Sequence, residues 1–188
     1  MSSFLRIAGA AALVISFGLA ARALPLDILN INISPLNHSD AVCHALNKMI
    51  DADIVVKLRA CVNAGTIADV KVAIDACVEV IKVCADALLK IDVGVTVDAV
   101  AKADIVACVA ALITLIVKVC LQLTLKFGVS VVATLFVELD ACVRLLLVNL
   151  DICIVGILDL IVKACVSVTL GLLAQVKLSL CANLFAGL

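Results

Sequence analysis

The sequence lacks tryptophan and tyrosine altogether, and it has only five phenylalanines, two prolines and two histidines in 188 residues. Charged residues make up 15%, against about 25% in an ordinary soluble chain. This low charge, combined with 66% hydrophobic residues, excludes a disordered chain. The net charge of −1, without a basic patch or stacking aromatics, argues against nucleic-acid binding. The missing Trp and Tyr also argue against a sugar-binding lectin.

Motifs that support catalysis or metal binding are absent as well. No glycine-rich phosphate loop is present, and no two cysteines are closer than seven residues, which excludes C-x2-C zinc spacing. His38 and His44 flank the start of the first expected helix and are predicted to be solvated or to sit at the helix end. The 15 acidic residues fall on regular polar faces, where solvated side chains are expected. The sequence therefore predicts a protein that is not an enzyme and has no cofactor.

The first 23 residues are typical of a secretory signal peptide. Arg6 supplies the positive charge, and residues 7–21 form an uncharged run of 15. Ala21-Arg22-Ala23 then provides a cleavage site, so the mature chain is expected to begin at Leu24. The alternative is a membrane anchor, but a spanning helix needs about 20 apolar residues. We therefore expect a secreted protein that is extracellular or attached to a cell wall.

The rest of the chain has no uncharged run long enough to cross a membrane. Residues 105–117 and 164–176 are the longest such runs, with 13 residues each. A spanning helix is expected from about 18 consecutive apolar residues. The sequence therefore predicts no integral membrane span.

Ten cysteines all follow the signal peptide. An even number in a secreted chain predicts disulfide bonds, here five. Two sequons, at Asn32 and Asn37, precede the first expected helix and predict glycosylation. Pro35 directly follows the first sequon, which favours Asn37. The cysteines are Cys43, Cys61, Cys77, Cys84, Cys108, Cys120, Cys142, Cys153, Cys165 and Cys181.

Beyond an extended leader at residues 24–38, a cysteine-rich domain at 39–188 shows degenerate repetition. Glycines recur at 65, 94, 128, 156 and 187, and each interval holds two cysteines. Apolar positions in the second unit have helical spacing, and Thr66 with Asp69 resembles a capping box. Ser39 or Asp40 is expected to cap the first helix. These features predict an all-α, disulfide-stapled bundle of about five helices built from antiparallel hairpins.

One segment favours a different structure. Residues 121–131 alternate between apolar and polar side chains, which is typical of a strand, and the high valine content points the same way. A mixed or β-rich fold is therefore the alternative to the helical bundle.

The spacing of the cysteines suggests which pairs meet. Folding two helices back near Gly128 places Cys120 opposite Cys142 and Cys108 opposite Cys153. The two pairs are off-centre from the glycine by nearly the same number of residues, 6 and 5, so a turn near residue 131 satisfies both. The same folding at Gly65 places Cys61 near Cys77 and Cys43 near Cys84. Cys165 and Cys181 remain for each other.

Composition also indicates a function class. A compact fold cannot hide so many apolar residues, so we expect an exposed apolar patch, an internal cavity or self-association. The first hypothesis is a surface-active or self-assembling protein that coats a wall or an interface. The alternative is an extracellular carrier of lipids or sterols with an apolar cavity. The expected partners are hydrophobic surfaces or lipids and further copies of the chain.

The profile resembles that of secreted fungal surface-active proteins, the hydrophobins and the hydrophobic-surface-binding proteins. The shared features are a signal peptide, a small size, a high apolar content and an even number of cysteines. Hydrophobins have two adjacent cysteine pairs, whereas this chain has none. The resemblance implies a coating role at hydrophobic surfaces.

Overall fold

The computed structural model describes residues 31–165, 171–173 and 175–187. The chain divides into two compact units, residues 1–30 and 31–188. The predicted signal peptide and the cleavage site before Leu24 lie outside the described residues. The described part of the second unit contains helices and no strand, which confirms the predicted all-α class. Its helices are α2 (Ala41–Asp51), α3 (Ile54–Asn63), α4 (Ile67–Leu88), α5 (Ala99–Phe127), α6 (Val129–Cys153), α7 (Ile157–Ala164) and α9 (Ser179–Ala186).

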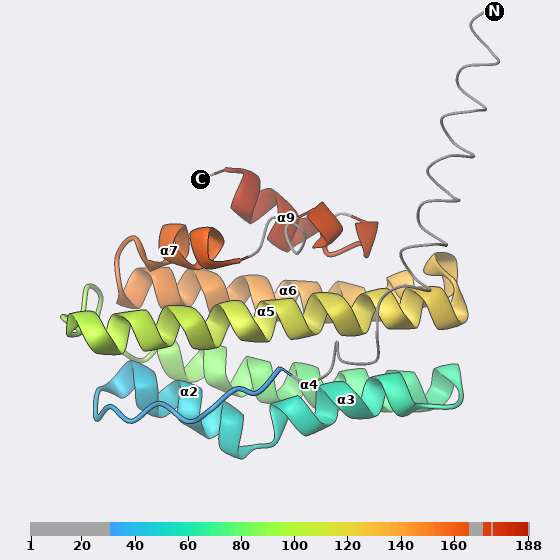
Figure 1. The fold of residues 1–188 in the computed structure, drawn as a ribbon, viewed down its shortest axis with the longest axis horizontal. Helices are drawn as coiled ribbons and strands as arrows, with labels where there is room; N and C mark the ends of the chain where they lie inside the picture. Colours follow the sequence, from blue (N-terminus) through green and yellow to red (C-terminus); the bar gives the residue numbers. More distant parts are fainter. Residues whose placement is uncertain (1–30, 166–170, 174, 188) are drawn as a thin grey trace, which may run out of the picture. The chain divides into compact units, whose positions relative to one another are not determined.

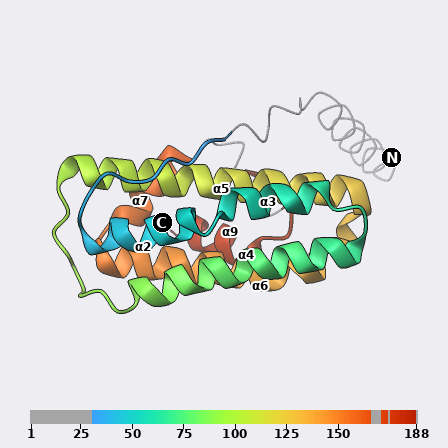
Figure 2. The ribbon, with the colours of Figure 1, turned by 90° about the horizontal axis from the view of Figure 1, so that it is seen from below.

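The described helices of the second unit form a bundle in which shorter helices cover the long helices α5 and α6. α4 packs most extensively against α6, and α3 packs against both α4 and α5. Figure 2 shows α2 and α3 lying between α4 and α5. On the other side, α7 contacts α5 and α6, and α9 contacts α6 (Figure 1). α5 and α6 therefore lie between two layers of shorter helices.

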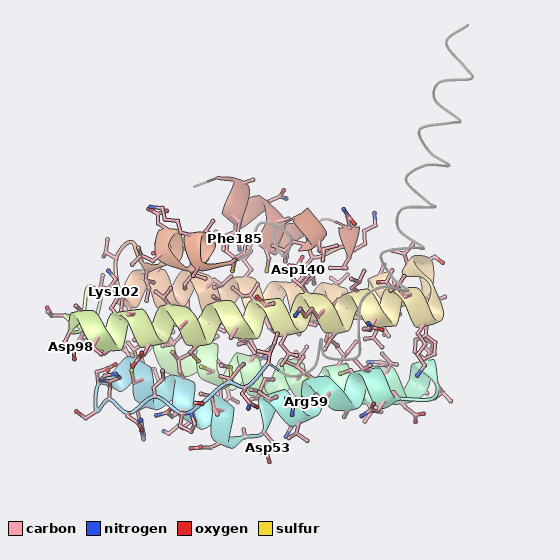
Figure 3. All side chains as sticks on the ribbon, in the orientation of Figure 1. Asp53, Arg59, Asp98, Lys102, Asp140 and Phe185 are labelled. Atoms are coloured by element: carbon pink, nitrogen blue, oxygen red, sulfur yellow. The ribbon has the colours of Figure 1, made fainter. Side chains whose placement is uncertain are left out.

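Polar side chains fix where three of the helices begin. The side chain of Asp40 accepts a hydrogen bond from the backbone N–H of Cys43, so Asp40 rather than Ser39 caps α2. Thr66 and Asp69 form the predicted capping box at the start of α4. Asp98 caps α5 by accepting bonds from the N–H groups of the next turn, and Figure 3 shows it at that helix end. Each cap satisfies backbone donors that the helix itself leaves free.

Gly65, Gly94, Gly128 and Gly156 each lie between successive helices, as the sequence predicts. Gly128 is the most constrained of them, because it alone separates α5 from α6. Its φ of 87° and ψ of 144° are outside the range that residues with a Cβ adopt readily. The chain can therefore end one long helix and begin the next at a single residue.

Two of the expected helices are broken, so the described residues form seven helices rather than about five. The first expected helix divides at Asp53, which adopts a left-handed conformation with φ of 59°. Aspartate tolerates this conformation better than most residues, and Figure 3 shows Asp53 between α2 and α3. The C-terminal unit divides as well, because α7 ends at Ala164, residues 171–173 are helical and α9 begins at Ser179.

α5 is the central helix, and its position explains the misleading alternation at 121–131. Residues 121–127 belong to α5 and residues 129–131 to α6, so the strand alternative is wrong for this segment. α5 has buried residues around most of its circumference, and such a helix has a weak 3.6-residue pattern. By length and composition it could also cross a membrane, but 67% of its most apolar window is buried. Its apolar surface thus has partners inside the bundle.

Candidate functional site

α6 has two apolar faces, of which only one faces the core. Its buried side chains include Phe136, Val143 and Leu150. On the opposite side, five apolar residues follow one another at intervals of three and four positions, which places them on one side of the helix. They are Val137, Ala141, Leu145, Val148 and Ile152, and we call them the outer stripe.

The outer stripe is open to solvent. Val137 is 61% exposed, Leu145 40% and Ile152 42%. The charged residues Glu138 and Arg144 lie beside the stripe on α6 rather than within it. Val148 is half-buried, but most of the row is exposed at the surface of the described residues, and exposed apolar patches mark contact surfaces.

Further exposed apolar side chains extend the stripe at the C-terminal end of α6. The connection between α4 and α5 runs beside this end, because the N–H of Gly94 donates to the carbonyl of Ile152 at 3.2 Å. Val93 in that connection is 75% exposed, and Val155, just after α6, is 73% exposed. α4 differs, since its exposed residues Val72 and Val83 alternate with charged residues.

All ten cysteines are free thiols, and nine of them are buried. The predicted pairs Cys120–Cys142 and Cys108–Cys153 are not bonded, and their members have different surroundings. Cys142 is partly exposed among charged residues of α4 and Glu138, whereas Cys120 is buried near Cys61. Cys153 donates a hydrogen bond to the carbonyl of Leu88 on α4. The prediction compared distances from Gly128 along the chain, but it did not consider which side of each helix carries the thiol.

Two groups of thiols converge between helices. The sulfur atoms of Cys61 on α3 and Cys77 on α4 are 4.0 Å apart, and both side chains are fully buried. Cys120 on α5 lies near enough to contribute to the raised pKa of Cys77.

The second group joins three helices in the same way. Burial raises the pKa of Cys43 and of Cys84 to about 12, and the nearby Cys108 adds to both shifts. These thiols lie on α2, α4 and α5. Neutral, buried thiols of this kind behave as small apolar residues and are poor nucleophiles. The remaining predicted pair, Cys165 and Cys181, is not bonded either.

Asp140 is a buried carboxylate that the sequence assigns to a solvated face, and this assignment is wrong. It is 2% exposed on α6. Its two oxygens accept hydrogen bonds from the N–H groups of Leu180 at 2.7 Å and Cys181 at 3.0 Å. Figure 3 shows Asp140 on the side of α6 that faces α9. The carboxylate therefore caps the first turn of α9 from another helix.

The leader contacts the bundle through polar groups on three helices, and one of these contacts is the hydrogen bond that Arg59 on α3 donates to the carbonyl of Ile31 at 3.3 Å. Asn47 on α2 accepts from the N–H of Leu36 and donates to its carbonyl, at 2.7 and 2.8 Å. His38 contacts Asp104 on α5 at 2.8 Å, so it is paired rather than merely solvated. His44 is exposed, as expected. The sequon residues Asn32 and Asn37 are exposed and line a cavity of about 300 Å³ between the leader and α5.

We expect the His38–Asp104 link to make the leader's attachment depend on pH. The hydrogen bond with Asp104 raises the pKa of His38 above its ordinary 6.5, and the charges of Asp98, Asp104 and Asp40 add to the shift. A group whose pKa is raised on folding stabilises the fold fully below pH 6.5, and this contribution is lost as the pH rises through the raised value.

Urea unfolding of the wild type and of His38→Gln at several pH values measures the effect. The stability difference should be largest below pH 6.5 and should shrink as the pH rises through the raised pKa of His38. A difference that stays constant across this range would show that the histidine acts only through packing.

Grooves between α4 and its neighbours α2 and α3 are shallow and lined by small residues. One of about 500 Å³ is lined by alanines of α3 and α4 together with Lys57 and Asp69. Another of about 140 Å³ is lined by residues of α2 and α4 that include Met49 and Val80. Neither is a deep cavity in the bundle interior.

The described residues contain no group of three or more His, Cys, Asp or Glu side chains that could hold a metal ion. The chain matches no protein-family model, and no curated protein or solved structure matches it.

Proposed function

We propose that this is a secreted, non-enzymatic protein that adsorbs to hydrophobic surfaces and coats a wall or an interface. The observation that carries the proposal is the outer stripe of α6, an exposed apolar row on a helix whose other face already supplies the core. Burial of apolar area provides about 25 cal/mol per Å². A row of aliphatic side chains along several helical turns therefore gives a useful driving force for adsorption.

The core supports the same proposal. Most of the buried residues are Leu, Val, Ile, Ala and Cys, and the buried polar residues among those described are Asp140 and Asn149. Cores of interchangeable aliphatic residues specify one packing only weakly. Such a bundle can open at an interface, where its helices exchange their contacts with each other for contacts with the apolar phase.

Secretion, glycosylation at Asn32 or Asn37, self-association and oxidation of the cysteines belong to this proposal. Exposure of both asparagines supports attachment of a glycan, which would add polar surface at the leader. Self-association would use the outer stripe, because a second copy can cover the same apolar row as an interface does. Disulfide bonds would limit how far the bundle opens.

A variant of the outer stripe tests the proposal. Val137→Thr, Leu145→Gln and Ile152→Thr together keep the helix but make the row polar. We expect this triple variant to adsorb less to polystyrene beads and to lower surface tension less than the wild type. The matched control is Val72→Thr with Val83→Thr, which changes exposed valines among the charges of α4. Equal loss of adsorption in both variants would contradict a specific role for the outer stripe.

The second candidate function is the carriage of a lipid or sterol. The groove of about 500 Å³ beside Lys57 favours it, because this volume lies within the range of ligand sites and the lysine could contact an anionic head group. Native mass spectrometry of the secreted protein separates the two functions. A monomer with bound lipid would support the carrier, whereas lipid-free oligomers or surface films would support the coat.

A further inference from the structure

Cys61 and Cys77 are the two thiols that the fold brings closest to bonding. Their sulfur atoms are 4.0 Å apart, and the Cys61 thiol also contacts the carbonyl of Lys57 at 3.4 Å. A disulfide has a sulfur–sulfur distance of about 2.05 Å. Rotation about the two Cα–Cβ bonds, with a small shift of α3 relative to α4 where the Cα separation requires it, would bring the sulfurs to this distance.

We infer that Cys61 and Cys77 form a disulfide bond that joins α3 to α4 across the turn at Gly65. The inference rests on the proposed secretion only for the supply of an oxidant. Among the pairs that cysteine spacing predicts, it assigns this one, because here the structure places the two sulfur atoms 4.0 Å apart.

The reaction is thiol–disulfide exchange with a small-molecule or protein disulfide. One cysteine thiolate attacks the oxidant and displaces its first thiol, and the second cysteine then attacks the mixed disulfide and displaces the other. The two cysteine sulfurs lose two electrons and two protons in total. The oxidant takes these up and leaves as two thiols, while one sulfur–sulfur bond forms in the protein and one is broken in the oxidant.

Burial determines when the bond can form. Both side chains are fully buried, so an oxidant reaches them only before α3 closes on α4 or when the two helices separate. Contact with Cys61 and burial also raise the pKa of Cys77, which slows attack in the closed state. The bond therefore forms during folding, and afterwards it is shielded from reductants.

The bond would divide the bundle into a fixed part and a part that can open. α3 and α4 would be held together near their shared turn, whereas α5 and α6 have no thiol pair at a comparable distance among the described residues. Opening at an interface would then begin by separation of α5 and α6 from the linked pair.

Tryptic peptide mapping tests the assignment, because Lys71 lies between the two cysteines. The full chain without its signal peptide is refolded with oxidised and reduced glutathione, alkylated under denaturing conditions and digested without reduction. We expect peptide 60–71 to be linked to peptide 72–82, each of which contains one cysteine. The linked pair should account for most of both peptides and should disappear in Cys61→Ser and in Cys77→Ser.

Controls separate the possible outcomes. Cys153→Ser removes a buried thiol elsewhere and should leave the linked peptides unchanged. Reduction should lower the thermal midpoint of the wild type by about 5–10 °C, as expected for a short closed loop. A link between peptides 60–71 and 119–126, which would identify Cys120 as the partner, overturns the assignment. Alkylation of both Cys61 and Cys77 after refolding also overturns it, and neither result depends on whether the protein coats surfaces.

Discussion

Replacement of Asp140 by Ala is expected to detach α9 from the bundle. The change removes the acceptors of two backbone N–H groups in the first turn of α9, the part-buried one of Leu180 and the buried one of Cys181. Hydrogen bonds to a charged group contribute about 1.5–3 kcal/mol each, and orphaned buried donors are costly. We therefore expect a loss of about 3–5 kcal/mol in the docking of this helix.

Hydrogen exchange followed by mass spectrometry measures this effect locally. Amides of residues 179–186 should exchange at least about 100-fold faster in Asp140→Ala, since 1.4 kcal/mol corresponds to a factor of ten. Asp140→Asn retains one acceptor oxygen and should show an intermediate effect. Glu138→Gln, an exposed change two residues away, is the matched control. Unchanged exchange in α9 of the Ala variant would show that other contacts hold this helix.

Truncation of Phe136 to Ala should cause the largest loss of global stability from one apolar substitution. Phe136 is fully buried on α6 and is the largest fully buried side chain among the described residues. Replacement of a buried phenylalanine by alanine costs about 3–5 kcal/mol, because transfer free energy is lost and a cavity remains. Urea unfolding followed by circular dichroism measures the change.

The neighbouring residue Val137 provides the control. It is 61% exposed, so Val137→Ala should change the unfolding free energy by about 0.5 kcal/mol or less. If Phe136→Ala costs less than about 1.5 kcal/mol, the core around α6 relaxes to fill the cavity. That outcome would indicate a more fluid core than the structure shows.

Local signals in the sequence predicted the helices well, since caps and glycines act over a few residues. Asp40, the Thr66–Asp69 capping box and Gly128 are examples, and the structure confirms each. The break at Asp53 was not predictable in this way, because the apolar pattern continues through it. Whether a residue inside such a pattern adopts the left-handed conformation depends on how α2 and α3 pack on α4.

The angular positions of residues around α6 would have predicted both the buried carboxylate of Asp140 and the outer stripe. Counts of polar and apolar residues along the chain do not use these positions. At 3.6 residues per turn, Asp140 falls on the same side of α6 as Phe136, Val143 and Leu147. A charged residue in that position predicts a buried partner, although nothing in the sequence identifies α9 as that partner. The same spacing of 3.6 residues per turn places the outer stripe on the side of α6 opposite the core face.

The spacing around Gly65 predicted that Cys61 lies near Cys77, and the structure confirms this proximity, whereas the pairs predicted around Gly128 are not bonded. Cys61 and Cys77 are close because α3 and α4 meet at the turn with these thiols facing each other. Cys120 lies 8 residues before Gly128 and Cys142 lies 14 residues after it, and Cys142 lies among charged groups of α4. Sequence distance from a turn fixes height along a helix, whereas the side of the helix decides which thiols meet.

Pendant-drop tensiometry of the purified chain without its signal peptide measures whether the protein coats an interface. We expect low micromolar protein to lower the surface tension of buffer to a stable plateau and to leave an elastic film on the drop. The outer-stripe triple variant should reach this plateau more slowly, or not at all. A wild-type protein that leaves the surface tension no lower than a charged soluble protein of the same size does would contradict the account.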